Sequence, residues 1–546
     1  MDDISWWAEG ANAGKVAAKL SAAVAASMEW AAENGVAFDH GKTEAALFQK
    51  GKRKKKVAEV AVAVGANSVP FNKAATRWLG VWLDSQLTLR DHHATSLKQG
   101  QRAMTRLRCL TGQMGLSPAN CRKVMTACIQ SVAMFGSELW WKGDHVRGTM
   151  GQANELQQLV NQEAWATTRW FRTTNLGALS MESSLRAATM QLENRQRRFG
   201  LWLLSLPAVD QAQEVVGAST GIGRRLKNAL AYGRQPERTV LLEELETCNA
   251  ELLQEEEAEA KAAAEGTRPG LTMFTDGSRL EGGATGYLVV WKMGQPWVGV
   301  KVHMGNNQEA YDAECAALAR ALELALQRNE IPEVVTIFSD AQAAIRWMAS
   351  DERGPGWEYA LQARKHIATL RQSRPGIIIE VRWCPAHKGV AGNEKAHEWA
   401  KIAAEKSGTL GVEWLNFPVR TEVRGAPLPR SLTNLKREIS EKKWVETRQW
   451  AGGRTSRKKY RMPDSQKPNC AVANSTKRLA SRFYQLKMGH CLTGQYLNWT
   501  KSRTTPQCWW CRYRSQNQDH LFKECPEWKP QQKILWAEVK KDFFFV

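Results

Sequence analysis

The sequence lacks the features of membrane and secreted proteins. No run of about 18 apolar residues occurs, and no apolar segment follows a basic start, so neither a transmembrane helix nor a secretory signal is expected. The eleven cysteines are odd in number and mostly scattered, which argues for reduced thiols and against a disulfide framework. We therefore expect an intracellular protein of the nucleus or cytoplasm with no membrane partner and an undefined oligomeric state.

Charge is distributed unevenly along the 546 residues. The net charge of +21 divides into +12 over residues 1–238, −7 over 239–269, zero over 270–407 and +16 over 408–546. Lys and Arg release counterions from phosphates, so basic segments around a neutral one favour a nucleic-acid partner. The alternative is a basic protein without such a partner. The 24 Trp residues offer stacking surfaces, although most buried Trp side chains simply fill cores.

The first half of the chain is mainly helical in its periodicity. Helical spacing over Val16–Trp30 precedes an alternating stretch over Trp78–Leu89 that is typical of a hairpin strand, and residues 91–238 are mainly helical. Residues 239–265 are rich in Glu and Ala, and they predict one solvated helix that separates two domains.

The segment over residues 271–406 changes to an α/β pattern. Strands are expected over 271–275, 286–292, 298–303, 334–338 and 377–383, and helices over 310–328, 341–349, 359–372 and 392–406. This series predicts one α/β domain with a mixed sheet. Beyond residue 408 the sequence is basic and richer in loop signals.

Three carboxylates of the α/β segment fall where a metal site could form. Asp276 ends the first strand, Glu314 lies inside the long helix, and Asp340 ends the fourth strand. Strand ends of an open α/β sheet meet at one edge, and two-metal hydrolysis of a phosphodiester needs several hard oxygen ligands. For each residue alone the alternative is a helix cap or a surface charge, but the ordered set favours the metal site.

The blocks that hold these residues resemble a type 1 ribonuclease H. They read TDGS with Asp276, AYDAECAAL with Glu314, FSDAQAAI with Asp340, and WCPAHKGVAGNEKAHEWA with His387. The resemblance implies a ribonuclease H-like five-stranded mixed sheet and cleavage of the RNA strand of RNA–DNA hybrids with two Mg²⁺ or Mn²⁺ ions. It further implies that Asp276 bridges both metals, that Glu314 and Asp340 each ligate one, and that His387 assists proton movement or product release.

One position departs from that family. Its last helix begins GNExAD, whereas residues 392–397 read GNEKAH, so His397 stands where an Asp completes the metal set. Imidazole can bind Mn²⁺ or Zn²⁺ but suits Mg²⁺ poorly and brings no negative charge. With His397 as a candidate ligand we expect weaker cleavage in Mg²⁺, partly rescued by Mn²⁺; the alternative is a nucleic-acid-binding relic. Ser278 and Gln342 are expected to contact the nucleic acid.

The N-terminal segment, which includes ATRWLGVWLDSQLTL, resembles the later half of a reverse-transcriptase palm. The resemblance implies a vestigial polymerase metal motif at Asp2 and Asp3 and a primer-grip hairpin over Trp78–Leu89. The order of segments resembles the C-terminal part of a fungal Tad-type non-LTR retrotransposon polyprotein. It implies a partial palm (1–90), a helical thumb and connection (91–238), a linker helix (239–269), ribonuclease H (270–407), a basic connector (408–505), a zinc knuckle (506–530) and a tail (531–546). Polymerase activity needs a further palm carboxylate, so we expect none from this chain unless a partner chain supplies it.

Four potential zinc ligands lie near the C-terminal end. Cys508, Cys511, His520 and Cys525 have the spacing C-x2-C-x8-H-x4-C, which gives soft ligands in tetrahedral reach of one Zn²⁺. The alternative is three unrelated Cys and a His. The pattern resembles the CCHC knuckle of such retrotransposon proteins, with a longer central gap than a retroviral knuckle has.

Aromatic and basic residues alternate within this motif. Trp509 and Trp510 interleave with Arg512 and Arg514. Stacking of bases on the rings and phosphate contacts of the guanidinium groups would suit single-stranded nucleic acid. The alternative role of the rings is packing around the metal.

Overall fold

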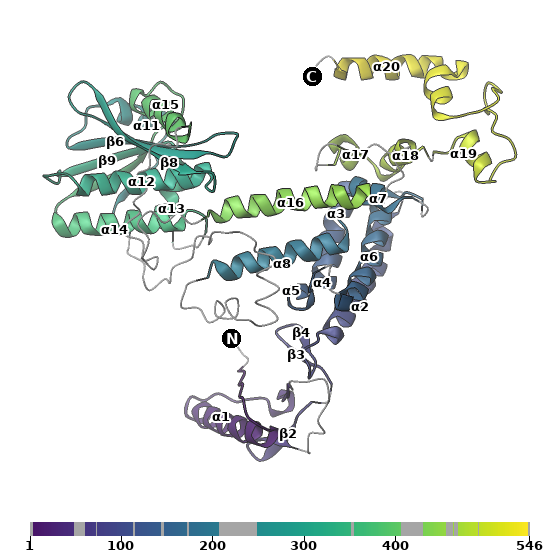
Figure 1. Ribbon diagram of the computed structural model, residues 1–546, viewed down its shortest axis with the longest axis horizontal. Coiled ribbons are helices and arrows are strands. Elements are labelled where there is room, and N and C mark those ends of the chain that lie inside the picture. Colours follow the sequence, from purple (N-terminus) through teal and green to yellow (C-terminus); the bar gives the residue numbers. More distant parts are fainter. Residues whose placement is uncertain are drawn as a thin grey trace. The chain divides into compact units, whose positions relative to one another are not determined.

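The computed structural model describes residues 4–48, 60–72, 74–112, 115–143, 147–171, 174–206, 248–350, 354–405, 430–454, 462–463, 468–489 and 491–543 (Figure 1). None of the helices in these ranges is long and apolar enough to cross a membrane. The chain divides into two compact units, the first made of Met1–Glu193 with Trp444–Val546 and the second of Asn194–Lys443. Asp2 and Asp3 lie outside the described residues.

A six-stranded mixed sheet forms the centre of the second unit, in the order β5-β10-β9-β6-β7-β8. β6, β7 and β8 form an antiparallel meander, and β9, β10 and β5 extend it in parallel from β6. The strands are β5 (Glu251–Leu253), β6 (Leu271–Arg279), β7 (Thr285–Lys292), β8 (Trp297–Gly305), β9 (Val334–Ser339) and β10 (Ile378–Trp383). The five strands expected from the sequence are confirmed to within a few residues.

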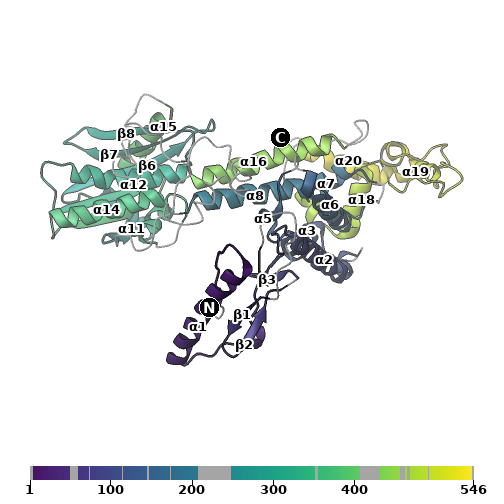
Figure 2. The same ribbon diagram turned by 60° about the horizontal axis from the view of Figure 1, so that its bottom comes forward.

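Helices cover both faces of this sheet, with α12 and α14 on one side and α15 on the other (Figure 2). Successive strand residues point to opposite faces, so Met273 packs among α12 and α14 whereas Phe274 packs against α15 and α11. The four helices expected over residues 310–406 are confirmed. The helices are α11 (Glu257–Glu265), α12 (Ala310–Leu326), α13 (Gln342–Ala349), α14 (Trp357–Ser373) and α15 (Ala391–Glu405).

The expected single helix over 239–265 is wrong within its described part, which starts at residue 248. Glu251–Leu253 form β5, so the sheet has six strands where five were expected. Only Glu257–Glu265 is helical, and its Ala264 is buried against the sheet rather than solvated. The many Glu residues favour a solvated helix on composition, and a three-residue strand is too short for periodicity to reveal.

The first unit begins with a helix on a small hairpin. The elements are α1 (Ala13–Glu33), β1 (Ala61–Val64) and β2 (Asn67–Pro70), packed through Ala17, Val62 and Val64. A second hairpin joins β3 (Thr76–Trp78) to β4 (Val81–Leu83). Its turn residues, Leu79 and Gly80, have φ angles of 46° and 84°, so a hairpin forms here as expected, although it begins at Thr76 and ends at Leu83.

The described chain from Arg90 to Leu206 is helical, as expected. The elements are α2 (Arg90–Arg106), η2 (Leu107–Thr111), α3 (Pro118–Val124), η3 (Met125–Gln130), α4 (Ser131–Ala133), α5 (Ser137–Trp140), α6 (Arg147–Thr168), α7 (Leu176–Ser183) and α8 (Ala188–Leu204). Met125, Trp141 and Leu156 are fully buried in the core of the first unit.

Helices also dominate the described residues beyond 430, where loop signals were expected. They are α16 (Leu432–Gly452), α17 (Cys470–Asn474), α18 (Lys477–Lys487), α19 (Gly494–Trp499), η5 (His520–Glu524), η6 (Pro526–Trp528) and α20 (Lys529–Phe543). α18 joins the helical core of the first unit, where Tyr484 meets Trp170 edge-on at 5.6 Å between ring centroids. Its apolar stripe is narrow and lies among many basic residues, which hides it in the sequence.

Candidate active site and metal-binding cysteines

The structure brings the three expected carboxylates together. Glu314 lies in the second turn of α12 and Asp340 directly after β9, as expected. Asp276 does not end its strand as expected, because pairing with β7 continues β6 to Arg279. One ligand oxygen from each lies within 4.8 Å of the others. Because β6 and β9 are parallel neighbours, their aspartates reach the same part of the sheet, and α12 brings Glu314 to it.

Two glycines allow helices to approach the strand that carries Asp276. A Cβ on Gly277 would lie 2.5 Å from the backbone N of Glu314, so only glycine lets α12 come this close to β6. A Cβ on Gly392 would likewise lie 2.3 Å from the Phe274 ring, which allows α15 its close packing on the opposite face. These two glycines belong to the TDGS and GNE motifs of the sequence.

Two histidines stand beside the carboxylates. Nδ1 of His397, on α15, lies 3.1 Å from Oδ2 of Asp276. The ring of His387 meets that of His397 edge-on, with centroids 4.8 Å apart. His387 is exposed and has a φ of 55°, a left-handed conformation that is unusual for a residue other than glycine. All five expected catalytic residues therefore lie together.

Burial and mutual repulsion perturb the three carboxyl groups. Burial, reinforced by the charge of Asp340, raises the pKa of Asp276 to about 6, although His397 opposes the shift. Burial, followed by the charges of Asp276 and Asp340, raises the pKa of Glu314 well above its usual range. Burial also raises the pKa of Asp340. The crowded site therefore favours a proton or a cation among its oxygens.

The donor set fits divalent metal ions. Burial and then the charge of Asp276 raise the pKa of Glu314, so a positive charge between these carboxylates would stabilise both. Oε2 of Glu314 is buried and has no hydrogen-bond partner among the described residues. A Mg²⁺ or Mn²⁺ ion bound by Asp276, Glu314 and Asp340 would supply the missing positive charge to these hard oxygens.

A comparison with known protein families gives a match to the segment that contains these three carboxylates. A family model described as RNase H matches residues 268–405. Residues 268–405 are an RNase H domain. The match spans β6 to α15 and includes the three carboxylates and both histidines. A comparison with the curated proteins finds no match.

Several solved structures are similar to the RNase H domain. RNase H1 from the halophilic archaeon Halobacterium salinarum NRC-1 shares 20% identity over 25% of this chain and 97% of its own, with a TM-score of 0.20. LC11-RNase H1 from compost, in complex with RNA/DNA hybrid, shares 21% identity over 25% of this chain and 96% of its own (TM-score 0.20). A foamy viral protease-reverse transcriptase in complex with dsDNA shares 16% identity over 25% and 95% (TM-score 0.19).

One residue that the sequence analysis missed supports the site of the RNase H domain. The buried side chain of Asn393 hydrogen-bonds to the carboxylate of Asp340 and lowers its pKa against the effect of burial. Asn393 belongs to the GNEKAH motif, and this motif is the sequence feature that could have identified it as a site residue. The indole Nε1 of Trp383 donates to the backbone O of Asp340 at 3.2 Å.

The two expected nucleic-acid contacts of the RNase H domain lie near the carboxylates in sequence. Ser278 pairs with Gly286 across β6 and β7 and is partly exposed. Gln342 begins α13, where its Oε1 accepts a hydrogen bond of 3.4 Å from Nη2 of Arg346. Their contact with nucleic acid stays a prediction.

The four expected zinc ligands also converge, within the first unit. Ligand atoms of Cys508, Cys511, His520 and Cys525 lie within 4.8 Å of one another. Sγ of Cys511 is 3.2 Å from Nε2 of His520, and the sulfurs of Cys508 and Cys525 are 3.9 Å apart. Burial opposes ionisation of Cys508, but the backbone N–H groups of Cys511 and Trp510 outweigh it and lower the pKa of this thiol to about 6. Soft ligands in this arrangement fit one Zn²⁺.

The rings around this cluster are partly exposed rather than buried. Trp509 and Trp510 are 39% and 45% exposed. The guanidinium group of Arg503 lies over the Trp509 ring at 4.4 Å, and Trp510 meets Trp528 edge-on at 5.0 Å. Each Trp therefore has an aromatic or cationic neighbour and still presents ring surface, and its contact with nucleic acid stays a prediction.

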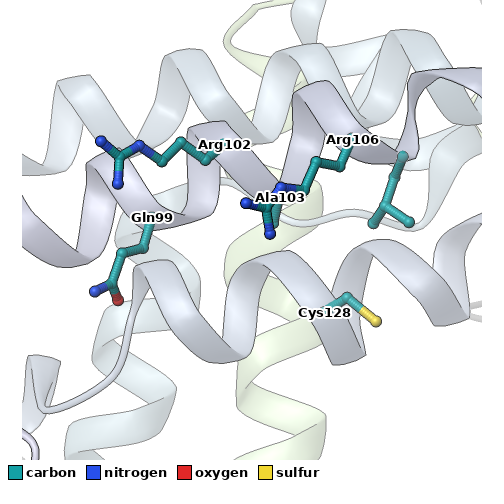
Figure 3. Close-up of a pocket in the computed structure, with 6 residues that line it drawn as sticks. Gln99, Arg102, Ala103, Arg106 and Cys128 are labelled. Carbon is teal, nitrogen blue, oxygen red and sulfur yellow. The ribbon is translucent and has the colours of Figure 1, made fainter.

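A cavity of about 360 Å³ opens between α2 and η3 of the first unit (Figure 3). Arg102 and Arg106 lie one turn apart on α2, and both side chains are exposed. The cavity is lined by Gln99, Arg102, Ala103, Arg106, Leu107 and Cys128. With no carboxylate in its lining, this cavity offers no ligand set for Mg²⁺ and is not the candidate active site.

Proposed function

We propose that the chain cleaves the RNA strand of RNA–DNA hybrids in a metal-dependent reaction. The observation that carries the proposal is the convergence of Asp276, Glu314 and Asp340 within 4.8 Å inside the RNase H domain. Three carboxylates from separate elements, with raised pKa values and a buried unpaired oxygen, are suited to bind two Mg²⁺ or Mn²⁺ ions.

Each residue of the site has a separate task in this proposal. Bound metal ions would activate a water molecule and stabilise the charge that develops on the phosphate. Asp276, Glu314 and Asp340 would hold these ions through their carboxylate oxygens. His387 lies on an exposed segment, where its ring can take or deliver a proton at the leaving oxygen.

His397 supports a second candidate function. Its Nδ1 lies 3.1 Å from Oδ2 of Asp276, the carboxylate on which the metal set depends, and an imidazole brings no negative charge. A chain weakened in this way would bind nucleic acid without cutting it. The order of its segments supports an origin in a non-LTR retrotransposon polyprotein under either function.

We also propose a Zn²⁺ ion held by Cys508, Cys511, His520 and Cys525. With Trp509, Trp510, Arg512 and Arg514 around it, this knuckle would bind single-stranded nucleic acid. The proposal is supported by the convergence of the ligand atoms and by the exposed indole rings.

The test is cleavage of a labelled RNA–DNA hybrid by the full chain in Mg²⁺ and in Mn²⁺. Asp276→Asn is the inactive reference, and Glu281→Gln, which removes an exposed carboxylate in the loop after β6, is the matched control. RNA cleavage that Asp276→Asn reduces by at least 100-fold and Glu281→Gln leaves unchanged supports the ribonuclease. Hybrid binding without cleavage in either metal would establish the nucleic-acid-binding relic instead.

A further inference from the structure

A helix beyond the matched family segment contacts the RNase H domain. The family match ends at residue 405, and α16 begins at Leu432. The backbone N–H of Ser431 donates to the backbone O of Asn307 at 3.1 Å. From the first two turns of α16, Asn434 Nδ2 and Arg437 Nε donate to Oε1 of Glu309 at 3.1 and 2.9 Å.

Glu309 is the residue that starts the helix of Glu314. It is the N-cap of α12 and forms a capping box with Asp312, whose Oδ2 accepts from the Glu309 backbone N–H at 2.7 Å. Oε2 of Glu309 lies 3.3 Å from Nε of Arg279, which is three residues after Asp276 on β6. One carboxylate therefore connects the strand of Asp276, the helix of Glu314 and α16.

This junction is partly buried, with the Arg437 side chain 39% exposed and Glu309 more enclosed. The Glu309 side chain is 16% exposed, and Asn434 is fully buried. Leu432, Leu435 and Ile439 on the same helix form a buried apolar cluster. A partly buried, charge-assisted contact beside this apolar cluster holds α16 against Glu309 more strongly than an exposed ion pair would.

We propose that Arg437 and Asn434 are positioning residues of the RNase H domain and that residues 430–443 complete it. They hold the Glu309 carboxylate, which fixes the first turn of α12 and therefore the place of Glu314 beside Asp276. The inference rests on the proposed metal site. Ligands of a two-metal centre must be held within about 0.5 Å, so a small displacement of α12 weakens metal binding before it affects contact with the substrate.

The test is Mn²⁺ binding to the full chain, measured by calorimetry and corrected with the Asp276→Asn variant for ions bound elsewhere. Arg437→Met is compared with Lys436→Met, which removes a neighbouring exposed charge from the same helix. We expect Arg437→Met to raise the dissociation constant for Mn²⁺ at least fivefold, Lys436→Met to leave it unchanged and Arg437→Lys to restore part of the affinity. Cleavage should show the same change in half-saturating metal concentration, with KM for the hybrid within twofold.

Unchanged Mn²⁺ binding in Arg437→Met overturns the proposal. If Arg437→Met fails to fold, the Asn434→Asp variant provides the test. It places a like charge against Glu309 without removing Arg437. Wild-type affinity for Mn²⁺ in this variant would also overturn the proposal. A wild-type chain that binds Mn²⁺ in an Arg437-dependent manner but cuts no hybrid supports the positioning role while refuting the proposed ribonuclease.

Discussion

Nδ1 of His397 lies 3.1 Å from Oδ2 of Asp276, so an imidazole nitrogen faces the carboxylate at the centre of the RNase H site. This contact engages a carboxylate oxygen that would otherwise be available to a metal ion. The same ring meets His387 edge-on, so the two histidines form a continuous pair beside the carboxylates.

Replacing His397 by Asp should increase Mg²⁺-dependent cleavage. His397→Asp removes the imidazole beside Asp276 and adds a fourth hard ligand with negative charge, which Mg²⁺ prefers to imidazole. We expect the rate in Mg²⁺ to rise about tenfold, a lowering of the barrier by about 1.4 kcal/mol, with a smaller rise in Mn²⁺. Initial rates on a labelled hybrid in the two metals measure the effect.

The matched control for this variant is His303→Asp, a histidine of β8 whose Nδ1 contacts the backbone O of Ala403. It introduces the same residue outside the carboxylate set and should leave the Mg²⁺ to Mn²⁺ ratio unchanged. An unchanged cleavage rate in Mg²⁺ for His397→Asp would show that His397 does not weaken Mg²⁺-dependent cleavage.

Loss of one cysteine ligand should release zinc from the knuckle. Cys508→Ser removes one of four converging ligands, and structural Zn²⁺ contributes about 10–16 kcal/mol to the folding of such modules. We expect bound zinc to fall from one equivalent to well below half. Elemental analysis of the purified chain measures this, with the exposed Cys470→Ser as control. Full zinc content in Cys508→Ser would contradict the site.

Removing the exposed indoles of the knuckle should weaken single-strand binding. A base stacked on an aromatic side chain contributes about 1–3 kcal/mol, so we expect Trp509→Ala with Trp510→Ala to lower the affinity for single-stranded RNA at least tenfold. Fluorescence anisotropy measures it. Trp30→Ala on α1, where the indole is also about half exposed, is the control.

Replacing the arginines of the knuckle should reduce the salt dependence of single-strand binding. Each ion pair with a phosphate that is removed lowers the slope of log K against log salt by roughly 0.7 for single strands. Arg512→Gln with Arg514→Gln should therefore lower the slope by about 1.4. An unchanged affinity in the tryptophan variant, together with an unchanged slope here, would assign these side chains to packing around the metal.

Glu163 in the helical core should make the stability of the first unit depend on pH. It is fully buried on α6, and Oε2 accepts a hydrogen bond of 2.6 Å from Gln130 while Oε1 has no partner among the described residues. Burial raises the pKa of this carboxyl to about 8, although the Gln130 hydrogen bond opposes the shift. The folded state therefore binds more protons than the unfolded state between about pH 4.5 and pH 8.

The free energy of unfolding should consequently fall as pH rises through this window. Glu163→Gln cannot ionise and removes the slope, so we expect it to stabilise the first unit by a few kcal/mol, on the order of 4, above pH 8 and by little near pH 5. Urea unfolding at the two pH values measures the difference. Equal effects at both values would show that Glu163 ionises normally.

The sequence was sufficient for the parts of the RNase H domain that local patterns encode. Apolar runs located five strands, and the order of Asp276, Glu314 and Asp340 on two strands and a helix predicted their convergence, although β6 continues beyond Asp276 to Arg279. The glycines of the TDGS and GNE motifs allow α12 and α15 to pack closely on β6. Both features depend on short segments whose chemistry is visible without knowledge of distant contacts.

Contacts between distant segments were not visible in the sequence. Glu309 reads as a surface acid, yet it meets Asn434 and Arg437, more than 120 residues later. The Glu-rich composition of β5 and α11 likewise predicts a solvated helix. What decides their structure is pairing with β10 and packing on the sheet, which no local periodicity records.

β5 has a consequence for the behaviour of the protein at high concentration. Residues 251–253 pair with 380–382 of β10, whose other side already pairs with β9. A chain that lacked β5 would present the backbone N–H and C=O groups of β10 to solvent, and such a row can recruit a strand from another molecule. These three residues therefore protect the domain from intermolecular strand pairing, and a fragment that begins at residue 268 should self-associate where one that begins at 248 stays monomeric.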